Sequence, residues 1–277
     1  MPYNKVKENE EQKSMKNEYI QYTEKIYFKH EVSYKLPKDV YSMHTHDVYE
    51  LLYFLEGDAS LVIEDRKYKL NKGDLILIRP FHYHYIQIDS CTDYERYDIL
   101  FDPLRDRIDG LELLGEEREV IPILENTVAQ NIFRKTDIYR ERCCKEQFEV
   151  LLPHMLSELF YSVGLFTDES FGTGKRLSPL ISDALSYINR TICSIRDIEE
   201  IAEHLFVSES YLFRRFKAEL HQTPRRYIMS KRLLLARQRL LLGEKPTEVS
   251  GKLGFGDYTA FYRNYKAFFG HAPTDRR

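Results

Sequence analysis

Two different periodicities follow one another along this chain of 277 residues. Between about residues 31 and 102, short apolar runs alternate with polar turns such as Glu56-Gly57-Asp58 and Asn71-Lys72-Gly73. Runs rich in β-branched and aromatic residues are typical of strands, and strands that recur about every 8 to 12 residues predict a β-barrel or β-sandwich. The expected strands cover residues 49–55, 59–63, 67–70, 74–79, 83–88 and 94–101.

The second periodicity is helical and begins near residue 130. Apolar residues at helical spacing predict two helices before residue 165, and the polar, glycine-containing segment 167–178 is the expected linker. Further helices are predicted at 180–192, 198–205, 208–220, 224–242, 247–253 and 257–268. The expected parts are therefore a flexible arm (1–25), a β domain (26–130), a helical pair suited to dimerisation (131–166), the linker (167–178) and an all-α domain (179–277).

Charge separates the two halves of the chain more sharply than the overall composition does. The formal net charge is only −3, but residues 178–277 carry 17 Lys and Arg against 11 Asp and Glu, which leaves −9 for residues 1–177. A basic final third is expected of a module that binds phosphate groups, whereas an acidic first part is not.

An internal repeat lies in the basic part. At an offset of 49 residues, RRFKAELHQTP (214–224) matches RNYKAFFGHAP (263–273). Each copy consists of a short helix, a turn and a second helix, which is the order of a helix-turn-helix. The apolar residues of each second helix must face a core. The outward side chains, which we expect to contact DNA, are Ser210, Phe213, Arg214, Lys217, Tyr258, Thr259, Tyr262, Arg263 and Lys266.

These repeats resemble the DNA-binding domain of the AraC/XylS family of transcription regulators over about residues 180–277. The segments IAEHLFVSESYLFRRFKAELHQTPRRYI and EVSGKLGFGDYTAFYRNYKAFFGHAP carry the resemblance. It implies two helix-turn-helix units joined by a long helix, double-stranded DNA as the partner, a homodimer, and RNA polymerase as a further partner. Four positions depart from the usual pattern: Phe206 and His221 replace glycines, Ser250 replaces alanine, and Arg276 replaces a tyrosine.

The β domain contains a second motif, His44-Thr45-His46 followed by Glu50. On a strand, residues 44, 46 and 50 share one face, and the spacing resembles the first metal motif of the cupin barrels. His84 is the candidate fourth ligand. The readings left open are a metal site, groups that contact an organic effector, and core histidines.

AraC-like sensor domains resemble cupins in keeping such a stretch, typically while binding a small organic effector. This resemblance implies an N-terminal cupin-like barrel that binds an effector, for which a carbohydrate is one candidate class, and no metal or other cofactor. The side chains expected to face the effector are His44, His46, Glu50, His82, His84 and Tyr53.

We therefore expect a non-enzymatic, effector-responsive transcription regulator. The first eighteen residues lack the apolar core of a secretory signal, the stretch 150–166 is too short and too polar to cross a bilayer, and the four cysteines form no CxxC pair. A cytoplasmic location is expected. Two alternatives remain: a cupin metalloenzyme with a DNA-binding tail, and a constitutive regulator whose barrel serves only dimerisation.

Overall fold

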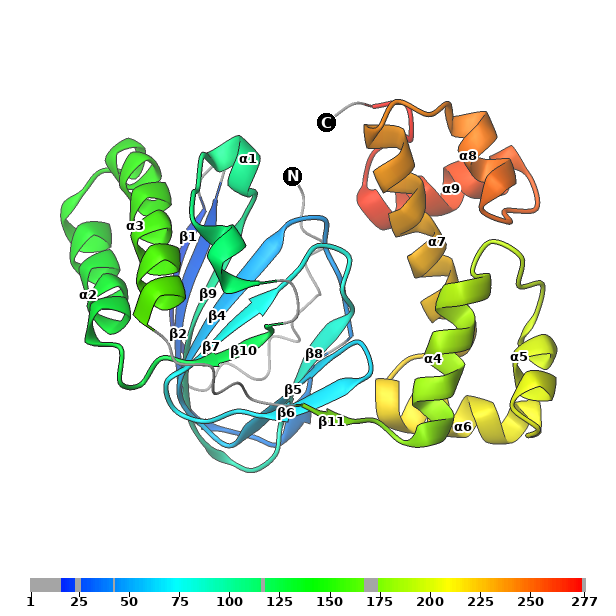
Figure 1. Ribbon diagram of the computed structural model, residues 1–277, viewed down its shortest axis with the longest axis horizontal. Coiled ribbons are helices and arrows are strands. Elements are labelled where there is room, and N and C mark those ends of the chain that lie inside the picture. The colour runs from blue at the N-terminus through cyan, green and yellow to red at the C-terminus, as the bar shows by residue number, and fades with distance from the viewer. Residues whose placement is uncertain (1–15, 23–25, 42, 116–117, 167–173, 276–277) are drawn as a thin grey trace. The chain divides into compact units, whose positions relative to one another are not determined.

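The computed structural model describes residues 16–22, 26–41, 43–115, 118–166 and 174–275 (Figure 1). The chain divides into two compact units, with the boundary after residue 175. The first unit is rich in strands and the second is helical, so the predicted fold class is confirmed. No helix of the described residues is both long and apolar enough to cross a membrane.

Two antiparallel sheets form the first unit. One has the strand order β1-β2-β9-β4-β7-β10 and the other has the order β11-β6-β5-β8-β3. Among the described strands none belongs to both sheets, so the arrangement is a two-sheet sandwich and not a closed barrel. The strands are β1 (Lys16–Tyr22), β2 (Tyr27–Leu36), β3 (Asp39–Val40), β4 (Tyr49–Glu56), β5 (Ala59–Ile63), β6 (Arg66–Lys69), β7 (Asp74–Ile78), β8 (His84–Ile88), β9 (Thr92–Phe101), β10 (Val120–Pro122) and β11 (Lys175–Arg176).

Part of the expected N-terminal arm is a strand. Residues 16–22 form β1, which pairs with β2 in an unbroken antiparallel register from Lys16↔Ser33 to Tyr22↔Tyr27. The segment has little apolar periodicity, but an edge strand is held by backbone hydrogen bonds that leave no apolar pattern in the sequence. The rest of the expected arm, residues 1–15 and 23–25, lies outside the described residues.

Both faces of the six-stranded sheet are covered. One face packs in a continuous apolar core against α2 (Thr127–Arg142) and α3 (Lys145–Phe166), with Phe28, Leu51 and Phe133 among its fully buried members (Figure 1). The opposite face forms a second core with the five-stranded sheet. Two short helices, α1 (Pro103–Asp106) and η2 (Leu111–Leu114), lie in the connection after β9.

The second unit contains the repeated helices, and the N-caps of the two copies correspond. Ser208 accepts a hydrogen bond from the Tyr211 amide, and Asp257 accepts one from the Ala260 amide, so each second helix begins where the repeat predicts. The helices are α4 (Pro179–Thr191), α5 (Ile198–His204), α6 (Glu209–Leu220), α7 (Pro224–Leu241), α8 (Pro246–Lys252) and α9 (Tyr258–Phe269).

The two turns share a left-handed residue but differ in length. Phe206 has φ 55° and Gly254 has φ 72°, and each follows the C-cap of the first helix in its copy. Phe206 occupies this conformation with its side chain 95% exposed, so the ring meets no steric barrier from the fold. Between the left-handed residue and the next N-cap there is one residue in the first copy, Val207, and two in the second, Phe255 and Gly256. The second turn is therefore longer by one residue.

Candidate DNA interface and sensor site

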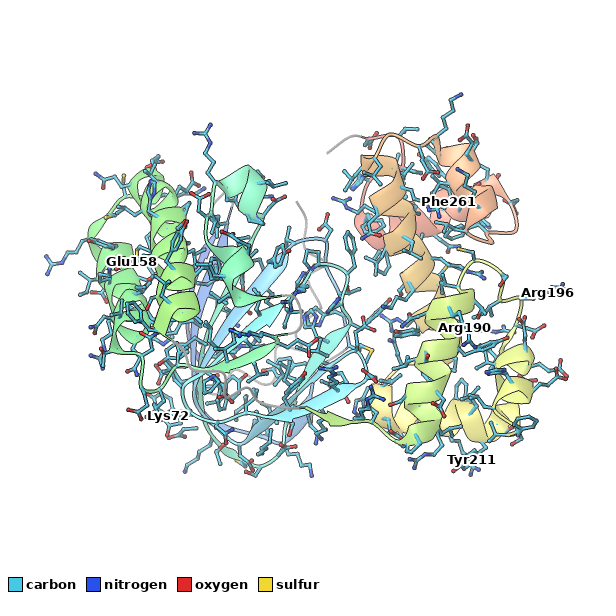
Figure 2. All side chains as sticks on the ribbon, viewed as in Figure 1. Lys72, Glu158, Arg190, Arg196, Tyr211 and Phe261 are labelled. Atoms are coloured by element: carbon cyan, nitrogen blue, oxygen red, sulfur yellow. The ribbon has the colours of Figure 1, made fainter. Side chains whose placement is uncertain are left out.

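The α6 helix presents an apolar face inward and a basic, aromatic face outward. Leu212, Phe216 and Leu220 are fully buried, at the helical spacing that the sequence predicts. Ser210, Phe213, Arg214 and Lys217 are exposed, and the last three line a shallow surface concavity together with Ala218. Tyr211, labelled in Figure 2, lies at the outer surface of the same helix and is 42% exposed.

The α9 helix repeats this division. Phe261, labelled in Figure 2, and Tyr265 are buried in a core shared with α7 and α8. The expected DNA-contacting residues lie outward: Tyr258, Thr259, Arg263 and Lys266 are exposed, and Tyr262 is half-buried.

The cationic side chains on these two helix faces form no ion pairs that would stabilise the fold among the described residues. Within the part of the chain that the structure describes, Arg214, Lys217, Arg263 and Lys266 form no ion pair. Arg215, the neighbour of Arg214, instead donates to Glu219 at 2.5 Å, and Glu219 also accepts from the Ser178 hydroxyl at 2.8 Å. Arg215 of α6 thus has a structural role, whereas Arg214 is available to bind a ligand.

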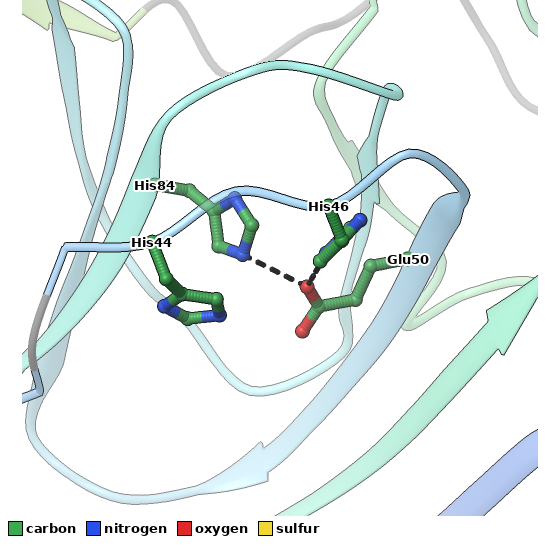
Figure 3. A group of neighbouring side chains, drawn as sticks. All are labelled: His44, His46, Glu50 and His84. Atoms are coloured by element: carbon green, nitrogen blue, oxygen red, sulfur yellow. Dashed lines mark hydrogen bonds and ion pairs between the residues drawn. The ribbon is translucent and has the colours of Figure 1, made fainter. Parts of the chain in front are cut away.

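Four side chains in the first unit converge on one point (Figure 3). His44 and His84 face each other across an isolated β-bridge, with both backbone N–H···O distances at 3.0 Å. Glu50 comes from β4 of the other sheet, and His46 lies in the segment before β4. His46 Nε2 lies 2.7 Å and His84 Nε2 lies 2.9 Å from the same Glu50 oxygen. One ligand atom from each of the four residues lies within 4.8 Å of the others.

The backbone determines which ring nitrogens point into this cluster. His46 Nδ1 lies 2.8 Å from the Val48 carbonyl oxygen, and His84 Nδ1 lies 3.0 Å from the His82 carbonyl oxygen. A carbonyl can only accept, so each Nδ1 carries the proton and donates it. Both Nε2 atoms therefore face Glu50, available to share a proton with the carboxylate or to coordinate a cation.

The cluster is electrostatically coupled. Burial lowers the pKa of His46, but the hydrogen bond and negative charge of Glu50 outweigh it, so the pKa of His46 is raised. Burial raises the pKa of Glu50, yet the charge of His84 and the hydrogen bonds from His46 and His84 hold it well below its usual range. Glu50 is thus ionised at neutral pH and favours a proton on the imidazole of His46 or a metal ion within the cluster.

Two of the six residues expected to face the effector lie outside this cluster. Tyr53 is three positions from Glu50 on β4 and so points to the opposite face, where its ring stacks on Phe133 at 4.3 Å under α2. The His82 side chain is 36% exposed, with Nδ1 3.9 Å from a Glu119 oxygen, and its backbone carbonyl contacts the cluster through His84.

Sequence reasoning missed a strip of buried charge beside the cluster. Glu31, Arg96 and Asp98 lie on the inner face of the sandwich, in the register Glu31↔Arg96 of β2 and β9 and Leu52↔Asp98 of β4 and β9. Arg96 Nη2 lies 3.5 Å from Glu31 and 3.6 Å from Asp98, longer than a direct hydrogen bond. Arg96 Nε and Asp98 Oδ1 are buried without a hydrogen-bond partner among the described residues. Such atoms are suited to bind a polar group that enters the sandwich.

Burial and the negative charge of Glu50 together raise the pKa of Asp98 to about 7, against the opposing effect of Arg96. The strip therefore changes its charge near neutral pH. The signal available in the sequence was the alternation of Arg96 and Asp98 with Tyr97 and Ile99, which ordinarily marks a solvent-facing side of a strand.

Two protein families match separate parts of the chain. Residues 32–135 match the family described as the AraC-like ligand binding domain, and residues 201–277 match the family described as the helix-turn-helix domain. The first match contains the histidine cluster and the buried charges, and the second contains α6 and α9.

Known proteins also resemble the chain over most of its length. The HTH-type transcriptional activator RhaR of Escherichia coli O1:K1 is 24% identical over 265 residues, covering 89% of this chain and 90% of that protein, and RhaR of Shigella flexneri matches equally. ToxT from Vibrio cholerae is 15% identical, covering 90% of this chain and 97% of that chain, with a TM-score of 0.36. The C-terminal domain of AraT from Geobacillus stearothermophilus is 30% identical, covering 36% of this chain and 84% of that chain, with a TM-score of 0.34.

Proposed function

The chain belongs to the AraC/XylS family of DNA-binding transcription regulators, and we propose that it reads DNA with α6 and α9 under the control of an effector bound by the first unit. One observation carries the first half of this proposal. Arg214 and Arg263 occupy equivalent outward positions on two capped helices and form no ion pair among the described residues. Arginine can bond two acceptors of guanine in the major groove, so such a side chain is suited to read a base.

The remaining outward residues would position the helices. Lys217 and Lys266 are suited to phosphates, because an ammonium on a flexible stem gives affinity without base information. The exposed rings of Phe213 and Tyr258 offer apolar contact to thymine methyl groups, and Ser210 and Thr259 offer hydroxyls.

The effector would bind inside the sandwich, between the histidine cluster and the buried strip of Glu31, Arg96 and Asp98. These groups supply cationic, anionic and imidazole partners within a largely apolar core, which suits a small polar molecule that carries several hydroxyl or charged groups. A carbohydrate is one such class. The effector changes transcription only if it binds two arrangements of the protein with different affinity.

The convergence of His44, His46, Glu50 and His84 favours a second candidate ligand, a divalent transition metal. Each of the two Nδ1 protons is held by a backbone carbonyl, as in many metal-binding histidines, and the Nε2 atoms face the carboxylate. Three imidazoles and a carboxylate suit iron, manganese, nickel or zinc. Such an ion would neutralise Glu50 and link the two sheets.

One variant and one measurement separate the two ligands. With an organic effector, His46→Ala is expected to leave the fold and the basal DNA affinity largely intact but to abolish the effector response, because the side chain touches the ligand and not the DNA. Elemental analysis of protein purified without added metal should then find no stoichiometric metal. Near-stoichiometric metal that survives dialysis, with a melting temperature that falls on chelation, would establish the metal instead.

Three further assignments complete the proposal: a homodimer formed through α2 and α3, contact with RNA polymerase at the promoter, and a cytoplasmic, non-enzymatic role. Exposed apolar side chains on the helical pair, including Ile138 (58%) and Val150 (62%), are consistent with a dimer surface there. The full chain, screened by thermal shift against sugars and other metabolites, tests the sensor role, since a ligand specific for the native state raises the melting temperature. A hit should also change operator affinity; a protein whose DNA binding responds to no ligand would be a constitutive regulator.

The two units are expected to behave differently as fragments. Residues 178–277 should retard DNA at low salt, with an affinity that falls steeply as salt rises, because phosphate neutralisation releases counterions. Residues 1–165 should not bind DNA, because they contain neither helix-turn-helix copy. Electrophoretic mobility shift at several salt concentrations measures both. Loss of binding by the basic fragment, with its helical circular dichroism intact, would contradict the assignment of the DNA-reading surface.

A further inference from the structure

The two helix-turn-helix copies are joined by α7, which packs against both. Near its start, the ring of Tyr227 contacts Phe216 of α6 at a centroid distance of 5.6 Å. Farther along, Leu233 and Ala236 are buried with Val249 of α8 and the ring of Phe261. Packing of this apolar kind is non-directional, so by itself it leaves freedom in the angle between the copies.

Arg232, in the middle of α7, adds directional bonds to the loop that leads into the first copy and to the turn of the second. Its Nε donates to the Ile192 carbonyl at 2.8 Å and its Nη2 donates to the Ile195 carbonyl, both in the connection between α4 and α5. Its Nη1 donates to the Gly254 carbonyl at 2.9 Å, in the turn between α8 and α9. One planar guanidinium therefore joins the loop that leads into the first copy to the turn of the second.

This arginine has no carboxylate partner within the described part of the chain, although it is only 8% exposed. Burial lowers its pKa, but a guanidinium remains charged, so the three carbonyl oxygens are what compensates its desolvation. The five donors of a guanidinium lie in a fixed fork, so carbonyls that satisfy it are held at fixed directions. Displacing either loop would leave a buried charge partly unsatisfied.

Gly254 shows how closely the two copies approach. A Cβ atom at this position would lie 2.8 Å from the Cys193 carbonyl oxygen and 3.1 Å from Arg232 Cζ. Gly254 also has φ 72°, a conformation that glycine adopts without steric cost. The turn before α9 therefore lies directly against the loop after α4, with Arg232 beside them.

We propose that Arg232 is a positioning residue that fixes the relative placement of α6 and α9, and with it the spacing between the two DNA subsites that one protomer recognises. Each base pair added between two subsites rotates one of them by about 35° and moves it by about 3.4 Å. A rigid pair of helices can follow such a change only by straining the protein or the DNA. The inference rests on α6 and α9 as the reading helices.

The test uses the full chain and an operator obtained from random DNA by in vitro selection. Variants of that operator carry one base pair more or one fewer between the two subsites, and another has one subsite scrambled. We expect the native protein to lose at least about tenfold in affinity on a one-base-pair change, or about 1.4 kcal/mol. Arg232→Met keeps the approximate length and packing of the side chain but removes the three hydrogen bonds. A one-base-pair change in spacing should lower the affinity of this variant by less than about threefold.

The pattern of affinities separates positioning from a general loss of stability. A merely destabilised protein binds every operator more weakly in the same proportion, whereas loss of positioning flattens the spacing profile and leaves the affinity for the half-scrambled operator at the native value. A folded Arg232→Met variant with the native spacing profile overturns the proposal, as does a native protein indifferent to spacing. If the in vitro selection yielded no preferred DNA sequence, that result would instead count against α6 and α9 as the helices that read DNA.

A second pair of variants decides the question if Arg232→Met does not fold. Gly254→Ala places a methyl group against the Cys193 carbonyl, whereas Gly243→Ala imposes a similar backbone strain, at φ 91°, with nothing within 4 Å of the new atom. Gly254→Ala should shift or flatten the spacing profile, and Gly243→Ala should keep it. Equal profiles for the two variants would refute the proposal.

Discussion

Replacing Arg214 by alanine should weaken binding to the selected operator by about 5- to 150-fold, or about 1 to 3 kcal/mol, while binding to unrelated DNA stays nearly unchanged. Arg263→Ala should do the same at the other subsite. Both side chains are exposed, repeat-related and free of ion pairs among the described residues, so neither loss should come from the fold. Titration of each variant against operators mutated at single positions measures the effect, because the lost contact should appear as lost discrimination at one base pair.

Lys217→Ala and Lys266→Ala are the matched controls, one on each helix. Each should lower the affinity for operator and unrelated DNA by a similar factor and reduce the salt dependence by about one counterion. Arg215→Ala is a structural control, because Arg215 is paired with Glu219. If both arginine variants bound the operator as the native protein does, the base-reading role of these positions would be wrong.

The second large effect concerns the buried charge of Asp98. The native pKa of about 7 lies above the unfolded value of about 3.9, so the native state holds the extra proton between these two pH values. The contribution of this bound proton to the free energy of unfolding is therefore complete below pH about 4 and is lost as pH rises through about 7. Asp98→Asn, similar in shape and never ionised, should raise the stability of the first unit at pH 8 by up to about 4 kcal/mol, with little effect at pH 4.

Urea unfolding followed by circular dichroism at pH 4, 6 and 8 measures this effect. Asp137→Asn is a control of opposite sign. Burial raises the pKa of Asp137, but hydrogen bonds from His30 and Tyr97 outweigh it and lower the pKa. The stability that Asp137 contributes is present above its unfolded pKa, and its loss should therefore destabilise the protein at pH 8. An Asp98→Asn variant no more stable than the native protein at pH 8 would show that Asp98 is ionised there without cost.

The features that the sequence predicted well are those that depend on local periodicity. The repeat located both second helices of the helix-turn-helix copies and their N-caps Ser208 and Asp257, because capping and a buried stripe leave a pattern within a dozen or so neighbouring residues. The histidine motif similarly placed His44, His46 and Glu50 together, and His84 joins them across the β-bridge.

The features that it predicted poorly depend on what covers a face. Tyr53 alternates with Glu50 on β4, and nothing in the strand itself says that α2 covers one side and the second sheet covers the other. Arg96 and Asp98 resemble solvent-facing residues for the same reason. When one face of a strand is polar, its alternation pattern does not distinguish a strand that is buried on both faces from one with a face in solvent. The position of Arg232 depends on three carbonyls that lie 22 to 40 residues away.

The unequal turns of the two helix-turn-helix copies give the protein a direction on DNA. The first copy has one residue between its left-handed residue and its N-cap and the second has two, although the outward arginines and lysines of α6 and α9 correspond. A protomer built from unlike halves binds a sequence without internal symmetry. Reversing that sequence would turn the whole protomer around with respect to the start of transcription. The effect of an operator should therefore depend on its orientation as well as on its distance from the start site.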